Sequence, residues 1–306
     1  MHDDRFLKSR SRSPQSGASA SSVTAICPHP HGAVMQHEAI LLALIFMAAM
    51  LYSCVGHAGA SGYIAAMSLM GLAVETFRPA ALILNIFVAS VTSYRFIRAG
   101  HFDWRFFWPL ALASSPFAYW GGSLQIPSRV LYITLGVVLA ASAIRLVVEL
   151  KETEEETKKP PNWVLLLIGG ALGFLAGVSA TGGGIFLTPV LILTHWRKAK
   201  GAAAISSAFI FVNSVAGLAG QLQQGITIDP RIGYWLVAAL AGGAIGSELG
   251  ARRLTPWWLK KVMAAVLLVA AIKLITTVPK TKPKDATSPK PTAASAASPK
   301  RGALVY

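Results

Sequence analysis

Charged side chains are scarce in this sequence. Only 13% of its 306 residues are Asp, Glu, Lys or Arg, whereas 54% are hydrophobic. A soluble domain carries about 25% charged residues, so this chain has too few to cover a globular surface. Several of its apolar runs approach the roughly 20 residues that span a bilayer as a helix. The composition excludes a soluble globular protein and predicts an integral membrane protein.

Cysteine and the common catalytic motifs are also scarce. Cys27 and Cys54 are the only two cysteines, which excludes a structural disulfide framework. Cys54 lies in an apolar segment, where a packing role is favoured over a reactive one. The sequence has no Walker loop, no G-x-S-x-G elbow, no Cys/His cluster and no paired intramembrane carboxylates. We therefore expect that this chain does not itself use ATP, binds no metal or other cofactor, and carries out no enzymatic chemistry.

Much of the formal net charge of +15 lies at the two ends of the chain. The leader, 1–37, and the Lys/Pro/Ala-rich tail, 279–306, have too little apolar surface to fold and are predicted to be disordered. Basic tails can contact anionic lipid or nucleic acid, but solvated tails are the simpler interpretation, and no nucleic-acid motif accompanies them. Met35 opens an apolar run and is a candidate for the true start.

The rest of the chain predicts an all-α polytopic membrane protein, because open strands cannot span lipid with unpaired backbone groups. Two of its segments, 62–74 and 184–195, reach only about 20 Å at 1.5 Å per residue. If both short segments cross the membrane, the chain has ten crossings, and if both are re-entrant, it has eight. The ten segments are 39–55, 62–74, 80–97, 106–124, 130–148, 163–178, 184–195, 201–221, 232–250 and 258–278.

The two short segments mark an internal repeat. "VGHAGASGYI" at 55–64 aligns with "VSATGGGIFL" at 178–187, an offset of 123 residues. The repeats are 38–149 and 163–278, joined by a charged linker, 150–162. Because each contains five segments, an odd number, the two halves should be inverted. Loops after odd-numbered segments hold 13 Lys or Arg residues and the other loops 3, so we expect the former in the cytoplasm and both termini outside.

Inverted repeats with glycine-broken helices at matching positions are typical of secondary transporters. A broken helix leaves backbone N–H groups without partners, and the start of the following helix carries a partial positive charge. Such a helix start binds anions without a buried lysine. We expect the two breaks to face one another near the midplane. The alternative is that the glycines only allow close helix packing.

Uncharged polar residues and glycines near the breaks are the candidate substrate-binding residues. His57 is also a candidate for proton coupling, although a satisfied hydrogen bond is nearly as good an interpretation. Glu248 and Arg252 are predicted to form an ion pair, and Arg95 to extend from its helix end toward the interface. The candidates are Gly56, His57, Gly59, Ser61, Asn85, Thr181, Gly182, Gly183, Gly184, Ser206 and Asn213.

The motifs "VGHAGASGYIAAMSLMG" at 55–71 and "GVSATGGGIFLTPVLI" at 177–192 resemble the sulfite exporter TauE/SafE family, also called the toluene sulfonate uptake permease family. The resemblance covers about residues 38–278. It implies a multi-pass carrier of the bacterial inner membrane for small sulfur-containing anions, such as sulfite, thiosulfate, sulfoacetate and aromatic sulfonates. In the first motif Ser61 stands in the place of Gly184 and Ala66 in that of Pro189, so the second break is the closer match.

These patterns predict a permease or exporter of small anions that works by alternating access. Its expected partners are the anionic substrate and the lipid bilayer, with no nucleic acid, and a homo-oligomer is compatible with the sequence. Two other classes stay open. One is a non-transporting membrane scaffold or assembly factor, and the other, with less support, is a membrane-embedded enzyme.

Overall fold

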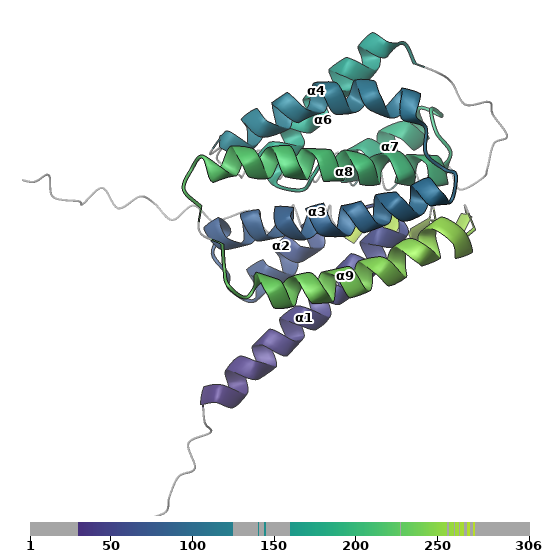
Figure 1. Ribbon diagram of the computed structural model, residues 1–306. Coiled ribbons are helices and arrows are strands. Elements are labelled where there is room, and N and C mark those ends of the chain that lie inside the picture. The colour runs from purple at the N-terminus through teal and green to yellow at the C-terminus, as the bar shows by residue number, and fades with distance from the viewer. Residues whose placement is uncertain are drawn as a thin grey trace, which may run out of the picture.

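The computed structural model describes residues 30–124, 160–226 and 228–255, with scattered positions between 140 and 272. Every regular element in these ranges is a helix, and α9 ends in a π-helical turn, Leu249–Arg253 (Figure 1). The predicted segments 130–148 and most of 258–278 lie outside the described residues, as do 1–29 and the tail 279–306. The helices are α1 Pro30–Cys54, α2 Ala60–Leu69, α3 Val74–Arg98, α4 Trp104–Ser123, α6 Asn162–Ser179, α7 Gly184–Leu193, α8 Ala199–Leu222 and α9 Ile232–Glu248.

The start of α1 differs from the prediction. The helix begins at Pro30, whereas the whole stretch 1–37 was expected to be a disordered leader. Proline is well placed at the first helical position, because its fixed φ suits the helix and its missing N–H group has no partner there anyway. The apolar run after Met35 is thus continued backward to Pro30 by the same helix.

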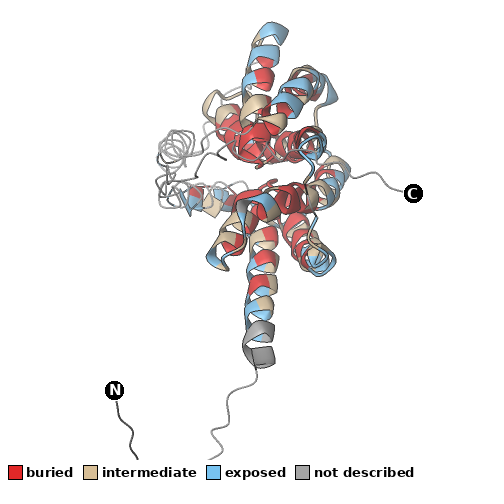
Figure 2. Ribbon diagram, turned by 90° about the vertical axis from the view of Figure 1, so that its left-hand side faces the viewer, coloured by how far each residue is buried: buried red, intermediate tan, exposed pale blue. Residues whose placement is uncertain are grey.

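Five of the described helices are long and apolar enough to cross a membrane: Gln36–Cys54, Glu75–Arg98, Asn162–Ser179, Ala199–Leu222 and Ile232–Arg253. α4 has 20 residues but is less apolar, because tryptophan, serine and proline interrupt its hydrophobic residues. α2 and α7 have 10 residues each and span about 15 Å. Viewed along the helices, buried residues face the centre and exposed ones the outside (Figure 2). Many exposed residues are large and apolar, as a lipid-facing surface requires.

Rows of glycine bring the long helices into pairs. On α9 the row consists of Gly242, Gly246 and Gly250. A Cβ atom at these positions would overlap, in that order, the carbonyl oxygens of Phe46, Met50 and Cys54 on α1. The matching order shows that α1 and α9 run in the same direction. Without side chains between them the two backbones lie in direct contact.

A second glycine row joins α6 to α4. It consists of Gly169, Gly173 and Gly177. A Cβ atom there would meet, in that order, the carbonyl oxygens of Leu110, Ser114 and Ala118 on α4. These two helices are therefore also parallel. Close packing, the alternative weighed for the glycines of the breaks, is the role of both rows.

Each short helix turns the chain back toward the side from which the preceding helix came. Gly62 of α2 lies against Ala48 of α1, so α2 folds back along α1 from the turn at 55–59. In the second half α7 runs antiparallel to α8, with Gly184 beside Ile210 and Thr188 beside Ser206. The two breaks are thus the tips of two helical hairpins, α1–α2 and α6–α7.

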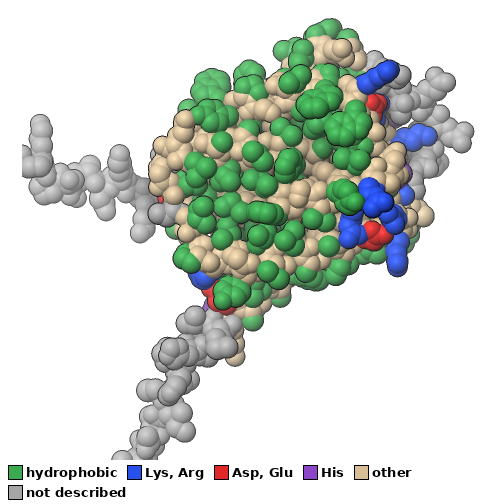
Figure 3. Space-filling view, in the orientation of Figure 1, with side chains coloured by type: hydrophobic (Ala, Val, Ile, Leu, Met, Phe, Trp, Pro, Cys, Tyr) green, Lys and Arg blue, Asp and Glu red, His purple; other side chains and the backbone are tan. Residues whose placement is uncertain are grey.

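The loops after α3, α7 and α9 meet at one end of the molecule, the basic end. Arg197 pairs with Asp103, and Lys200 Nζ lies 3.5 Å from the carbonyl oxygen of Ala251. Lys and Arg side chains gather at this end, and many hydrophobic side chains are spread over the surface beside it (Figure 3). Three of the basic loops predicted to share one side of the membrane therefore share one end of the fold, whereas the lysines of the linker 150–162 lie outside the described residues.

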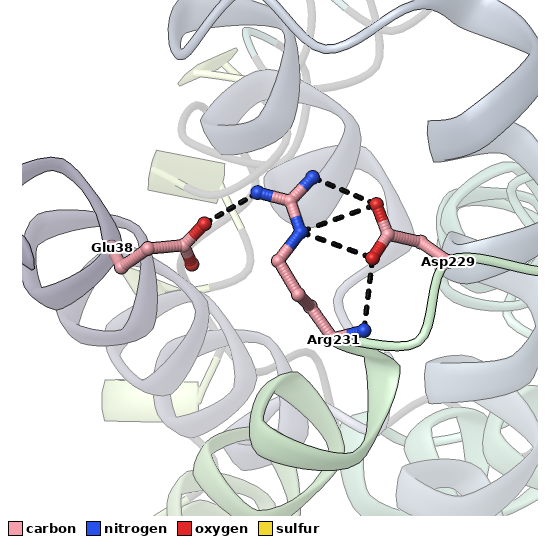
Figure 4. A network of polar contacts seen from close by, with 3 residues as sticks. All are labelled: Glu38, Asp229 and Arg231. Atoms are coloured by element: carbon pink, nitrogen blue, oxygen red, sulfur yellow. Dashed lines mark hydrogen bonds and ion pairs between the residues drawn. The ribbon is translucent and has the colours of Figure 1, made fainter. Parts of the chain in front are cut away.

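The opposite end has its own ion-pair network, which joins the start of α1 to the start of α9. Arg231 pairs with Glu38 and with Asp229, whose Oδ2 lies 2.7 Å from the guanidinium (Figure 4). Hydrogen bonds from Arg231 hold the pKa of Asp229 below its ordinary value. Since a carboxylate with a lowered pKa keeps its charge until the solution is strongly acidic, this contact persists through the physiological pH range.

Candidate functional site

The first break, residues 55–59, is tightly packed against α8. Gly56 has φ +79°, and a Cβ atom there would overlap the backbone of Ala203. Gly59 is the N-cap of α2 and lies against the ring of Tyr63, whose hydroxyl donates to the carbonyl oxygen of Ala58. The tip of the first hairpin is thus packed against Tyr63 of α2, and His57 is the side chain that extends from the tip toward α7.

His57 connects the first hairpin to the second half of the chain. The side chain is 2% exposed, and its Nε2 lies 2.7 Å from the hydroxyl of Thr188 on α7. Thr188 in turn donates to Ser206 on α8 at 2.7 Å. The other ring nitrogen, Nδ1, is buried and has no hydrogen-bond partner among the described residues. The satisfied hydrogen bond and the free nitrogen are both present, so neither interpretation of His57 is excluded.

The second break, residues 180–183, contains two successive glycines with positive φ. Gly182 has φ +74°, and Gly183, the N-cap of α7, has φ +79°. Any Cβ at Gly182 would lie 2.7 Å from Ile210, 2.8 Å from Ser214 and 3.1 Å from Asn85. Glycine is needed here for two reasons, the left-handed backbone and the close approach of three side chains.

Polar side chains from three helices converge on this second break. Asn85 on α3 donates from Nδ2 to the carbonyl oxygen of Thr181 at 3.3 Å and lies 3.5 Å from the hydroxyl of Ser214. The hydroxyls of Thr181 and Ser179 are 2.7 Å apart. Asn85 is fully buried, and its Oδ1 has no partner in the described part of the chain. The group is therefore neutral, rich in donors and incompletely satisfied.

Arg78 brings a positive charge to the same region. Its Nη2 donates to the carbonyl oxygen of Val178 at 2.9 Å, near the end of α6. The sequence placed Arg78 in a loop, but it lies inside α3, two helical turns before Asn85. The sequence could not predict this contact, because Arg78 and Val178 are 100 residues apart.

Both breaks pack on α8, and the contact of His57 with Thr188 joins the first break to the helix that follows the second. The first break lies against Ala203 of α8, and the second lies against Ile210 and Ser214. Seven residues of α8, about 10 Å along its axis, separate Ala203 from Ile210.

The predicted register of the repeat is wrong by one residue. The equivalent N-caps, Gly59 and Gly183, are 124 positions apart rather than 123. Left-handed residues Gly56 and Ala180 precede the two short helices at the same spacing. In this register Ser61 does not occupy the place of Gly184, because Ala60 does. A single extra residue is invisible to an alignment made of small, similar side chains.

Two predicted site residues lie apart from these contacts. Ser61 is buried in the first turn of α2. Asn213 donates to the carbonyl oxygen of Phe209 on its own helix at 2.9 Å, a local bond. The structure adds Thr188, Ser214, Ser179 and Arg78, which sequence reasoning missed. The three hydroxyl residues could have been found only from their neighbours, because a lone hydroxyl in a membrane helix is common, whereas the charge of Arg78 within a membrane helix was a signal in the sequence.

Comparison with known proteins decides the family. The family model described as "Sulfite exporter TauE/SafE" matches residues 41–274. The chain belongs to the sulfite exporter TauE/SafE family. It is 36% identical over 246 residues to the "probable membrane transporter protein" y4hK of Sinorhizobium fredii, covering 79% of this chain and 100% of that protein. A "probable membrane transporter protein" of Methanocaldococcus jannaschii is 31% identical over 144 residues, 45% of this chain and 52% of the relative. No solved structure matches the chain significantly.

This TauE/SafE protein is therefore a multi-pass membrane transporter and not an enzyme, and the resemblance read from its glycine motifs is confirmed. The matched range contains both breaks and every polar contact around them. In the described part of the chain no group of three His, Cys, Asp or Glu residues could hold a metal ion. What the site offers chemically is a set of neutral donors, two helix starts and one arginine.

Proposed function

We propose that the protein is a secondary transporter of small oxyanions of the sulfite, thiosulfate or organosulfonate class in the bacterial inner membrane. The observation that carries the proposal is the second break. There a helix start with two glycines lies beside Asn85 and Ser214 in a buried setting that contains no carboxylate among the described residues. Neutral donors and a helix start favour an anion over a cation.

The binding mode follows from the donors. The first N–H groups of α7 have no partners within the helix and can donate to an oxyanion at Gly183 or Gly184. Asn85 and Ser214 would contribute side-chain donors from α3 and α8, Thr181 lies between them, and Arg78 supplies positive charge nearby. The remaining predicted residues, Gly56, His57, Gly59, Ser61, Ser206 and Asn213, would line the path in the alternate state.

Alternating access is supported by the way the helices pair. α1 packs in parallel on α9, and α6 packs in parallel on α4, so the first helix of each half contacts the fourth helix of the other. α3 and α8 cross the centre in opposite directions, with Leu82 near Gly217 and Asn85 near Ser214. These exchanged pairs favour two inverted repeats, which can rock against one another around a central site.

His57 is the proposed proton carrier. It lies at the tip of one hairpin and contacts the short helix of the other, so a change in its charge would alter a contact between the two halves. Because Thr188 donates its hydroxyl hydrogen to Ser206, Nε2 of the neutral ring donates to Thr188, and protonation would add a second donor at the buried Nδ1, which would need an acceptor. Proton binding and movement of the halves would be coupled in this way.

Transport is tested with the purified protein in liposomes. We expect uptake of radiolabelled sulfite, thiosulfate or an aromatic sulfonate above that of protein-free vesicles. Ser214→Ala should lower uptake about tenfold, the cost of one lost hydrogen bond to a charged group. The matched control is Ser114→Ala, whose buried hydroxyl donates within its own helix to the carbonyl oxygen of Ala111. Absence of uptake for every anion would favour the non-transporting scaffold.

The proton role has a separate test in the pH profile of uptake. We expect His57→Ala to flatten the profile, and Thr188→Val to shift it without flattening it. His101→Ala is the control, since His101 lies in the loop before α4 and not at a break. A His57→Ala protein whose profile matches the wild type would remove proton coupling from His57 while leaving anion transport standing.

A further inference from the structure

A pocket of about 570 Å³ lies between the last turns of α3 and α9, at the basic end. None of the break residues lines it, so it is separate from the proposed transport site. Its polar walls are formed by Tyr94, Arg95, Arg98, Glu248 and Arg252.

The pocket carries an excess of positive charge. Arg95 forms an ion pair with Glu248, and Nε of Arg252 lies 3.5 Å from the other carboxylate oxygen, so the predicted pairing of Glu248 with Arg252 is present but shared. Arg98 donates to the hydroxyl of Tyr94 at 3.1 Å, and no described carboxylate forms an ion pair with it. Three guanidinium groups thus face one carboxylate. Such a cluster fits a phosphate, which accepts hydrogen bonds from several guanidinium groups at once.

An apolar surface leads directly into this pocket. On α3 the exposed positions Phe87, Tyr94 and Arg98 follow one another along one helix face, with Phe87 44% and Tyr94 58% exposed. On α9 the exposed face runs from Val237 through Ile245 to Arg252. Both faces are apolar at mid-helix and basic at the end, and Figure 3 shows the apolar surface ending at the charged cluster.

We propose that this pocket binds the headgroup phosphate of an anionic phospholipid, with the acyl chains along the exposed faces of α3 and α9. The ligand must be charged at one end and apolar over the length of several helical turns, which describes a phospholipid and not a small transported anion. Tyr94 stands between the two regions, at the depth where aromatic residues concentrate in membrane proteins. Basic pockets between membrane helices are recognised sites for anionic headgroups.

The inference is tested by native mass spectrometry of the full-length protein in detergent, titrated with phosphatidylglycerol or phosphatidylcholine. We expect phosphatidylglycerol adducts on the wild type and about tenfold weaker binding to Arg98→Gln/Arg252→Gln. The matched control is Arg105→Gln/Arg253→Gln, which removes the same charge from exposed arginines that do not line the pocket. Arg98→Gln alone leaves the ion pair of Arg95 with Glu248 in place, so weaker lipid binding by this variant would not be due to loss of that ion pair.

Three outcomes would overturn the proposal. Equal weakening in the pocket and control variants would mean that only the overall charge attracts lipid. Full displacement by glycerol 3-phosphate at the lipid concentration would mean a small-anion site with no contribution from acyl chains. A dimer that disappears in the pocket variant, with lipid adducts unchanged, would mean that a second copy of the chain covers this surface.

Discussion

Gly182 is the residue on which the second break depends most. It has a φ of +74°, and the three side chains close to it come from two distant helices, Asn85 from α3 and Ile210 and Ser214 from α8. Gly71 has a similar φ of +77°, but a Cβ atom there would have no neighbour within 4 Å, because it lies in the exposed turn after α2. The same backbone conformation therefore serves packing at one position and only a turn at the other.

This difference gives a prediction at the residue scale. Gly182→Ala should reduce anion uptake at least tenfold, since the new methyl group meets Ser214 and Asn85 as well as adding backbone strain. Gly71→Ala should add only the strain, about 1 kcal/mol, and leave uptake near the wild-type level. Uptake per folded protein in liposomes measures both. Equal losses in the two variants would show that strain alone matters and that the contacts at Gly182 do not.

At the scale of elements the glycine rows decide how close the helices come. The row on α9 allows direct contact with the carbonyl groups of α1, and the row on α6 does the same on α4. The glycines are not placed symmetrically, since one row belongs to the fourth helix of its half and the other to the first. Both halves nevertheless contribute to a close parallel pair. Both parallel pairs therefore depend on a glycine row, although the row lies on the fourth helix of its half in one pair and on the first helix in the other.

Gly246→Ala is the test of the row on α9. Its Cβ atom would overlap the carbonyl oxygen of Met50, so we expect a loss of about 2 kcal/mol, typical of overpacking. Gly233→Ala lies on the same helix with nothing within 4 Å and should gain about 0.5 kcal/mol from the better helix former. The apparent melting temperature in detergent compares them. A Gly246→Ala protein as stable as the wild type would show that α1 and α9 can separate at little cost.

At the scale of the whole molecule the charges define an orientation. The loops after α3, α7 and α9 meet at the basic end, and the loop after α8 meets the start of α1 at the other. By the excess of Lys and Arg, the basic end should face the cytoplasm. The described start of α1 would then face the periplasm.

Single cysteines test this orientation in a background with Cys27→Ser and Cys54→Ala. Lys198→Cys lies at the basic end, and Ile228→Cys lies in the loop after α8, both at exposed positions. An impermeant maleimide should label position 228 in intact spheroplasts and position 198 only after the membrane is opened. The reverse pattern would invert the proposed topology without affecting the fold.

Sequence alone predicted most helix boundaries to within a few residues. The predicted segments 163–178, 201–221 and 232–250 correspond to α6 Asn162–Ser179, α8 Ala199–Leu222 and α9 Ile232–Glu248. Long apolar runs and glycine breaks are local signals, since they depend on the cost of exposing backbone groups to lipid. The charge bias of the loops is local as well, and so is the family motif at the second break.

Only the tertiary structure decided which groups meet at the breaks. His57 contacts Thr188 at a separation of 131 residues, and Asn85 contacts Ser214 at 129. α2 folds back on α1, and α7 runs antiparallel to α8, and neither arrangement can be read from a run of apolar residues. In a membrane helix almost every residue is apolar or small, so sequence determines where a helix lies in the chain but carries little information on which of its faces meets a partner. That choice depends on the fit of glycine rows and a few buried hydrogen bonds between distant segments.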